Sequence, residues 1–275
     1  MFKNPKSKLY FIIILMAVIL MLGCLLSAAA SAHESIPDNV SERSSPENND
    51  DQVTAGGDDA HISTSEPGEE TIIPVETDKI ICIDPGHGWT DSGCVSSFTD
   101  KDGKPIYEKD INLAIAKYMK EELERRGYGV VMIRESDDLP SLSGSEGIVA
   151  RTQWVNGQDK IALMISIHCD SYEDAAATGT RVYWYNANHP ELTELGELLS
   201  TNLIFGEDPN SKIPLFPDTK GKFYPLTACS KPAVLVECGY LTNQKDAENL
   251  TDSEYQTAFG KALARSVDEY MRKRL

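Results

Sequence analysis

The chain carries little positive charge. Its 275 residues include 26 Lys and Arg against 43 Asp and Glu, which gives a formal net charge of −17. Residues 33–78 carry −12 of this charge and residues 1–32 carry +3, so residues 79–275 carry −8. Proteins that bind nucleic acid normally present a basic surface. The charge distribution therefore argues against nucleic acid as a partner.

Cysteine pairs with the spacing of a zinc knuckle are also missing. Beyond the N-terminal apolar segment the sequence has no CxxC pair, which argues against a structural zinc site of that kind. The remaining cysteines are odd in number, so at least one thiol stays free, and several lie in apolar stretches where buried thiols are usual. We therefore expect buried thiols rather than disulfide bridges. The five cysteines are Cys82, Cys94, Cys169, Cys229 and Cys238.

The N-terminus has the pattern of an export signal. A basic start with three lysines precedes an apolar run, Tyr10–Leu26, and then the small residues Ser27–Ala32. This order predicts a signal peptide over residues 1–32 with cleavage after Ala32. An uncleaved membrane anchor is the alternative, because the run is close to the length of a bilayer span. Lipid attachment at Cys24 is a third reading, and all three place the rest of the chain outside the cytoplasm.

Residues 33–78 are too acidic and too polar to form a core. They hold 13 Asp and Glu against one basic residue, Arg43, and are rich in Ser, Pro, Gly and Asn. Such a composition predicts a disordered segment. We interpret it as an acidic linker that tethers a folded domain, residues 79–275, to the signal or membrane.

Residues 79–275 alternate between short apolar runs and segments with helical spacing. This alternation predicts an α/β fold, in which a single domain has a twisted, mostly parallel central sheet with helices on both faces. Residues 205–231 show no clear hydrophobic period, so we expect them to form loops near a site. The expected strands are 79–84, 129–134, 161–168, 180–185 and 233–238, and the expected helices are 111–123, 145–156, 190–203 and one after a capping box at 251–254.

Two of these apolar runs stop at a histidine. His87 follows the run that begins at Ile81, and His168 follows the run that begins at Ile165. In open α/β folds the carboxyl ends of the strands carry the ligand site. Two imidazoles delivered to that edge predict a metal site, although a lone histidine at a strand end is more often a hydrogen-bonded structural residue than a ligand.

Two carboxylates extend this pattern. Glu108 begins the first amphipathic helix, and Glu237 closes the last apolar run. Two histidines and one carboxylate form a common ligand set for catalytic zinc, and a separate carboxylate is then needed to carry protons. Considered alone, Glu108 could equally be a solvated carboxylate at the start of a helix, stabilised by the helix dipole. Glu237 also fits a buried partner of an arginine such as Arg151 or Arg181.

Five segments in this order resemble the zinc-dependent N-acetylmuramoyl-L-alanine amidases of the type-3 family. The resemblance covers residues 79–274, and the five segments together are far more specific than any one of them. The segments are Asp84–Gly88, Glu108–Leu113, Ile165–His168, Gly179–Tyr183 and Pro232–Asn243.

The resemblance implies a function for the four polar residues. It implies that His87, Glu108 and His168 bind Zn²⁺ and that Glu237 is the catalytic acid and base. The implied reaction is cleavage of the amide between N-acetylmuramic acid and L-alanine in peptidoglycan, during cell-wall remodelling. Two other classes remain open, which are a non-catalytic wall-binding module and a zinc peptidase acting within the stem peptide. A missing ligand would favour the first, and none is missing.

The chain also departs from the family pattern. Trp89 stands where the family usually has Gly, and Cys169 follows the second histidine where small or apolar residues are usual. Neither departure removes an implied ligand. Arg151 and Asn156 occupy matching places, and the resemblance implies a structural role for both.

Overall fold

The computed structural model describes residues 72–137, 144–185, 187–203, 213–217 and 223–275. The expected signal peptide over residues 1–32 and most of the expected linker lie outside these residues. Within the described part, none of the helices combines the length and the apolar character that crossing a membrane requires.

A six-stranded sheet forms the centre of the domain, in the order β4-β1-β5-β8-β6-β7. The first four strands in this order are parallel to one another, while β6 runs antiparallel to β8 and β7 runs parallel to β6. The sheet is therefore mostly parallel, as the sequence predicts. The strands are β1 (Ile80–Pro85), β4 (Gly129–Met132), β5 (Ile161–Asp170), β6 (Arg181–Trp184), β7 (Leu215–Pro217) and β8 (Ala233–Tyr240).

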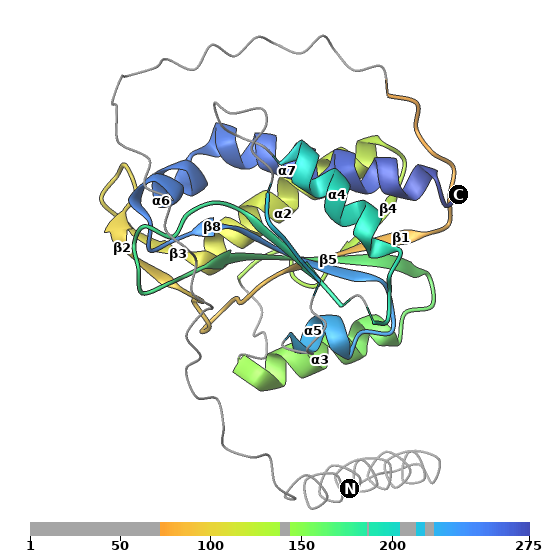
Figure 1. Cartoon of the computed structure of the whole chain (residues 1–275), viewed down its shortest axis with the longest axis horizontal. Helices are drawn as coiled ribbons and strands as arrows, with labels where there is room; N and C mark the ends of the chain where they lie inside the picture. Colours follow the sequence, from red (N-terminus) through yellow and green to blue (C-terminus); the bar gives the residue numbers. More distant parts are fainter. Residues whose placement is uncertain (1–71, 138–143, 186, 204–212, 218–222) are drawn as a thin grey trace, which may run out of the picture. The chain divides into compact units, whose positions relative to one another are not determined.

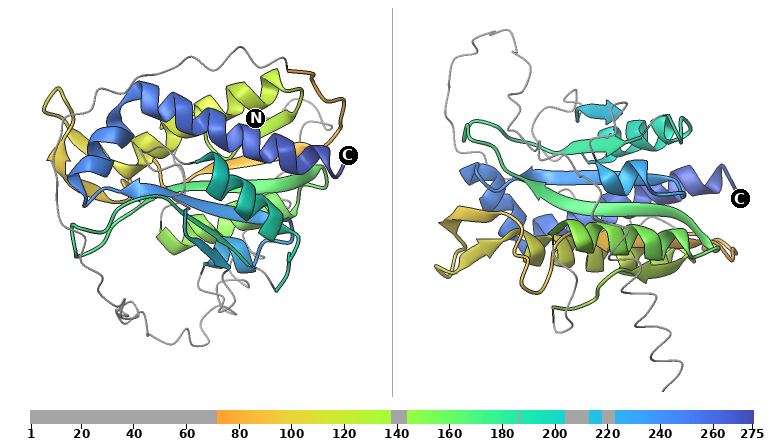
Figure 2. Two further views of the ribbon diagram at one scale, coloured as in Figure 1. Left: turned by 45° about the horizontal axis from the view of Figure 1, so that its top comes forward. Right: turned by 90° about the horizontal axis from the view of Figure 1, so that it is seen from below.

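Helices cover both faces of this sheet, which confirms the expected α/β architecture. One face carries α2 (Glu108–Arg125), α4 (Leu192–Asn202), α6 (Gln244–Thr251) and α7 (Ser253–Arg272), and the other carries α3 (Gly144–Asn156) and α5 (Tyr224–Thr227) (Figure 1). Figure 2 shows α3, in green, lying against the sheet when the molecule is seen from below. A small hairpin of β2 (Val95–Thr99) and β3 (Pro105–Tyr107) lies beside α6 at one end of the domain.

The alternation of side chains along the strands divides the apolar core into two clusters. In β5, Ile165 and Ile167 join the larger cluster under α2, α4 and α7, whereas Met164 joins the smaller cluster with α3 and α5. Because successive side chains of a strand point to opposite faces, the polar residue His168 faces the side of the smaller cluster. This side is where the polar residues of the sheet edge gather.

The expected helices begin and end largely where the apolar spacing places them, with one exception near the C-terminus. The expectation of loops alone over residues 205–231 is wrong, because β7 and α5 lie in that stretch. The expected capping box at residues 251–254 separates two helices. Asn243 caps α6, and the carboxylate of Asp252 caps α7 by accepting from the backbone N–H groups of Glu254 and Tyr255. The cap of α7 is therefore Asp252 and not Thr251, because the last residue of α6 is Thr251 itself.

Two expected strand ends are wrong. The strands expected to end at residues 168 and 238 are longer, since β5 continues to Asp170 and β8 continues to Tyr240. The two strands pair with each other beyond these residues, with an irregularity in register between His168 and Asp170. A polar side chain did not stop the ladder because the backbone of each strand keeps its partner beyond that residue.

Ordered contacts begin slightly before the expected domain start at residue 79. The backbone N–H of Val75 donates to the carbonyl of Arg126 at 2.9 Å, and Arg272 donates to the carbonyl of Ile73 at 2.6 Å. The end of the expected linker thus lies against α2 and α7.

All five cysteines beyond the N-terminal segment are free thiols, as expected. Four of them are buried, and Cys94 is partly exposed. They pack as small apolar side chains.

A buried ionic network joins the C-terminal ends of α2 and α7. The guanidinium of Arg126 donates to Asp268 at 2.8 Å and to Glu122 at 2.7 Å. The hydroxyl of Tyr128 donates to the other oxygen of Asp268 at 2.9 Å. Arg126 and Asp268 are 4% and 3% exposed, so each charge depends on its partners rather than on water.

Removing the carboxylate from this network should strongly destabilise the domain. We expect Asp268→Ala to lower the free energy of unfolding by about 3–5 kcal/mol, because it removes one of the two carboxylates that pair with the buried guanidinium of Arg126 and also the acceptor of the Tyr128 hydroxyl. Urea unfolding followed by circular dichroism measures this change. Glu135→Ala is the matched control, since Glu135 forms an exposed pair with Lys120 and should cost at most about 1 kcal/mol. Equal losses in the two variants would contradict the assignment.

Candidate metal centre

Three potential ligand atoms converge at the carboxyl edge of the sheet. His87, Glu108 and His168 each offer one ligand atom, and these atoms all lie within 4.8 Å of one another. Oε1 of Glu108 lies 3.1 Å from Nε2 of His87 and 3.0 Å from Nδ1 of His168. Ligands of a tetrahedral zinc ion, with bonds of about 2.1 Å, stand roughly 3.4 Å apart. The arrangement can therefore hold a metal ion with small side-chain adjustments.

Glu108 is the buried centre of this group. Its side chain accepts hydrogen bonds from the backbone N–H of Cys94 at 2.8 Å, the backbone N–H of Cys169 at 3.1 Å and the amide of Asn112 at 3.2 Å. Burial alone would raise the pKa of Glu108, but hydrogen bonds with His168 and His87 hold this pKa well below its usual value. The helix-start carboxylate is thus not a solvated residue, and it stays ionised.

The turn after β1 that carries His87 has unusual backbone geometry. His87 has φ of 61° and Trp89 has φ of 54°, in the left-handed region that side chains rarely adopt. Gly88 between them has φ of 130°. Gly86 is needed here for another reason, because a side chain at this position would overlap the ring of His168. Its lack of a side chain lets the two imidazoles approach to 5.0 Å between ring centroids.

Two arginines hold this turn through its backbone carbonyls. Arg134 donates to the carbonyls of Pro85 at 3.1 Å and Gly86 at 3.0 Å. Arg151 donates to the carbonyls of Pro85 and His87 and to the carboxylate of Asp84 at 2.8 Å. Hydrogen bonds of this kind offset the strain of a left-handed residue. Arg151 therefore has the structural contacts that the family resemblance implies, and it is not the partner of Glu237.

Asn156 likewise has structural contacts. Its amide donates to the carbonyl of Ala228 at 2.9 Å, and its side-chain oxygen accepts from the backbone N–H of Ser230 at 2.7 Å. These bonds tie the end of α3 to the segment that leads into β8.

Sequence reasoning missed two residues that support the centre. Oδ1 of Asp91 lies 3.0 Å from Nδ1 of His87, which leaves Nε2 directed at Glu108. A carboxylate on the second nitrogen orients a ligating imidazole and fixes its tautomer. Arg134, which braces the turn, is the other. The available signals were an Asp four residues after His87 and an Arg at the end of a predicted strand, and neither is specific in a sequence alone.

Glu237 joins the group from the neighbouring strand. It is the direct cross-strand partner of His168, so both side chains lie on the same face of the sheet. Oε2 of Glu237 is buried and has no hydrogen-bond partner among the described residues. Burial raises the pKa of Glu237 to about 7, with His168 opposing this shift and Asp170 and Glu108 adding to it. A carboxyl group with this pKa can accept and release a proton near neutral pH.

Trp89, which stands where the resemblance implies Gly, has a strained backbone. Its positive φ is one that Gly adopts without strain. The backbone is held by Asp137, which accepts from the Trp89 N–H at 2.8 Å, and by Lys109, which donates to the Trp89 carbonyl at 2.9 Å. Trp89 is 46% exposed, two residues after His87.

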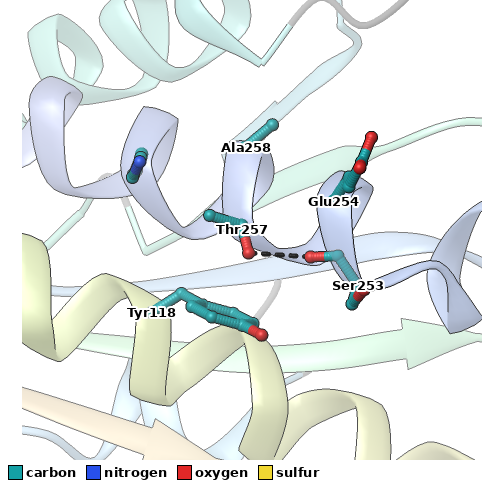
Figure 3. A pocket seen from close by; sticks show the side chains of 6 residues that line it. Tyr118, Ser253, Glu254, Thr257 and Ala258 are labelled. Carbon is teal, nitrogen blue, oxygen red and sulfur yellow. Dashed lines mark hydrogen bonds between the residues drawn. The ribbon is translucent and has the colours of Figure 1, made fainter.

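A separate hollow lies between α2 and the first turns of α7 (Figure 3). Thr257 donates to the carbonyl of Ser253 along its wall. None of the residues of the metal centre lines it. The lining residues are Tyr118, Ser253, Glu254, Thr257, Ala258 and Lys261.

Comparison with known proteins places the domain in a family. The N-acetylmuramoyl-L-alanine amidase family matches residues 81–269. A Bacillus subtilis (strain 168) protein named YqiI, itself uncharacterised, is 32% identical over 208 residues, which cover 75% of this chain and 91% of that protein. The probable cell wall amidase LytH of Staphylococcus saprophyticus is 32% identical over 195 residues, 70% of this chain. The chain spans 58% of that relative's length.

Solved structures agree. The CwlD amidase of Clostridioides difficile, determined in complex with the GerS lipoprotein, superposes with a TM-score of 0.60 at 26% identity over 71% of this chain and 99% of that chain. The catalytic domain of CwlV, an N-acetylmuramoyl-L-alanine amidase from Bacillus (Paenibacillus) polymyxa var. colistinus, superposes with a TM-score of 0.58 at 26% identity. The match covers 70% of this chain and 98% of that chain. The chain belongs to the N-acetylmuramoyl-L-alanine amidase family of enzymes.

Proposed function

We propose that residues 79–275 form a zinc-dependent catalytic domain that cleaves the amide between N-acetylmuramic acid and the L-alanine of the stem peptide in peptidoglycan. The observation that carries this proposal is the meeting of three ligand atoms within 4.8 Å beside a carboxylate, on Glu237, that has a buried oxygen without a partner. A non-catalytic wall-binding module would not need that unpaired carboxylate. Family membership supports the choice of substrate.

The donor set fits zinc. Two imidazole nitrogens and one carboxylate oxygen, with room for a further ligand, form a common catalytic zinc site. His87, Glu108 and His168 would hold the ion. When bound, zinc supplies the Lewis acidity that polarises a carbonyl and lowers the pKa of water.

The protein's own groups account for the proton transfers. Glu237 lies next to His168 in register, so it faces a substrate amide held over the three ligands. It accepts the proton of the attacking water and then gives it to the nitrogen of the departing alanine, which leaves as an amine. A pKa raised by burial to about 7 suits both steps, because the carboxyl group changes protonation state without a large free-energy difference.

The setting of this reaction follows from the N-terminal sequence. We propose that residues 1–32 export the chain as a signal peptide or retain it as a membrane tether, and that the acidic segment after them spaces the domain from the membrane. Peptidoglycan is then the partner that the enzyme meets outside the cytoplasm, in cell-wall remodelling.

Removing the proton carrier should abolish turnover but not metal binding. We expect Glu237→Gln to lower kcat by about 10²–10⁴-fold, which is the usual contribution of a positioned acid and base. Metal analysis and release of stem peptide from purified cell wall, followed by mass spectrometry, measure the two properties. Products with intact sugars and whole stem peptides distinguish an amidase from a stem peptidase. Wild-type turnover in this variant would remove Glu237 from the mechanism.

Removing a ligand should abolish metal binding. We expect His168→Ala to purify without stoichiometric zinc and to be inactive, since the remaining two ligands do not complete a catalytic site. Metal content by atomic emission measures this loss. His189→Ala is the control, because His189 pairs only with Glu191 on the surface among the described residues and should keep both zinc and activity. Full zinc occupancy in His168→Ala would be inconsistent with the proposed site.

Asp91 should affect the centre indirectly. We expect Asp91→Ala to weaken zinc affinity by about 10–100-fold, because it removes the carboxylate that orients His87. Asp91→Asn keeps a hydrogen-bond acceptor for His87 and for the backbone N–H of Gly93, so its effect should be smaller. Competition with a chelator of known affinity measures both. Unchanged affinity in Asp91→Ala would show that His87 needs no orienting partner.

A further inference from the structure

Arg181 lies in the same cross-strand row as the proposed catalytic residues. It is the direct partner of Glu237 across the antiparallel pair β6 and β8, and Glu237 is in turn the partner of His168 across β8 and β5. Side chains directly opposite one another on adjacent strands lie on one face, about 4.5–5.5 Å apart at Cβ. The row therefore runs from a metal ligand through the proton carrier to an arginine.

The position of the Arg181 guanidinium is determined by two contacts. Its central carbon lies 4.5 Å from the centroid of the Tyr240 ring, which is buried. Nη1 lies 4.0 Å from Oδ2 of Asp170, which is too far for a hydrogen bond. The stacking on Tyr240 holds the planar group without using its N–H donors.

Those donors have no acceptors in the described part of the chain. A guanidinium has five N–H groups, yet no described residue accepts a hydrogen bond from Arg181, and its Nη1 is buried without a partner. The side chain is 25% exposed, so the rest of the group reaches solvent. Nη1 of Arg134 is likewise buried without a hydrogen-bond partner, but the other donors of Arg134, and those of Arg151, bind backbone carbonyls of the His87 turn. An oriented arginine with unused donors is suited to a ligand that brings its own acceptors.

The ligand chemistry follows from the place of Arg181 in the row. If the scissile amide lies over the metal ligands with its nitrogen at Glu237, the departing peptide continues toward β6 and passes over Arg181. One residue of extended chain spans about 3.3–3.6 Å, so a group carried by the residue after alanine lies within reach of a long side chain that begins opposite Glu237. A guanidinium binds a carboxylate with two parallel charge-assisted hydrogen bonds.

We propose that Arg181 is a specificity-determining residue that binds a free carboxylate on the residue following alanine in the departing peptide, so that the enzyme prefers acidic stem peptides over amidated ones. This inference rests on the proposed amidase function. Arg181 contacts only the departing peptide, and it takes no part in the proton transfers of Glu237.

The test compares two synthetic N-acetylmuramoyl-peptides with the full-length enzyme loaded with zinc. One carries D-glutamate with a free α-carboxylate after alanine, and the other carries the corresponding carboxamide. We expect wild-type kcat/KM to be about 10–100-fold higher for the acid, as for a hydrogen bond to a charged group. Arg181→Gln should lower kcat/KM for the acid by that factor, mainly through KM, and leave the amide unchanged.

Two further variants separate the charge from its geometry. Arg181→Lys keeps the charge but loses the planar fork, so we expect an intermediate preference. Arg265→Gln removes one positive charge from the exposed surface of α7 and should leave both substrates unaffected. An equal loss of kcat/KM for both substrates in Arg181→Gln would indicate a purely structural role for Arg181 and would overturn the proposal.

The wild-type enzyme alone also decides the question if Arg181→Gln does not fold. Equal cleavage of acid and amide substrates by wild type would refute the role of Arg181 and leave the amidase function intact. Cleavage of neither substrate would refute the proposed function, and the inference with it.

Discussion

The buried carboxylate of Glu108 is the interaction on which the site depends. It accepts from backbone N–H groups at the start of the hairpin and near the end of β5, and it meets both imidazoles at about 3 Å. A buried ionised carboxylate is costly unless its oxygens are satisfied, so each of these contacts offsets part of that cost. The same contacts tie α2, β5, the hairpin and the turn after β1 into one unit. The geometry of the three proposed ligands and the local stability therefore depend on one side chain.

The register of the sheet places the remaining chemistry. β8 lies between β5 and β6, so Glu237 has His168 on one side and Arg181 on the other. A slip of one residue would turn Glu237 into the larger apolar cluster and bring Cys238 to the open face. The register is held by the apolar residues of β8, since Val234 and Val236 pack on one face and Leu235 on the other. The apolar core thus determines where the polar residues meet.

Polar contacts offset the strain at the His87 turn. His87 and Trp89, which flank Gly88, both have positive φ, and the carbonyls of Gly86 and His87 accept from Arg134 and Arg151. This explains why the family-typical glycine could be replaced by Trp89 here, since Asp137 and Lys109 hold the backbone on both sides of it. Strained backbone at a ligand-bearing turn is where local propensity and function conflict.

The sequence by itself determined the α/β class, most helices and strands, the buried thiols and the identity of the four polar residues at the sheet edge. The sequence could do so because apolar periodicity reflects burial, and because the segments that resemble the family's motifs contain these four residues. Only the tertiary structure decided where β5 and β8 end, that Asp252 caps α7, and that Asp91, Arg134 and Arg181 surround the centre. Each of these features depends on which strands are neighbours or on contacts between side chains that are far apart in the chain. The spacing of residues along a short segment does not contain that information. The sequence left Arg151 and Arg181 as equal candidates to pair with Glu237. In the folded domain Arg151 binds Asp84 and the His87 turn, while Arg181 stands opposite Glu237 with its donors unused.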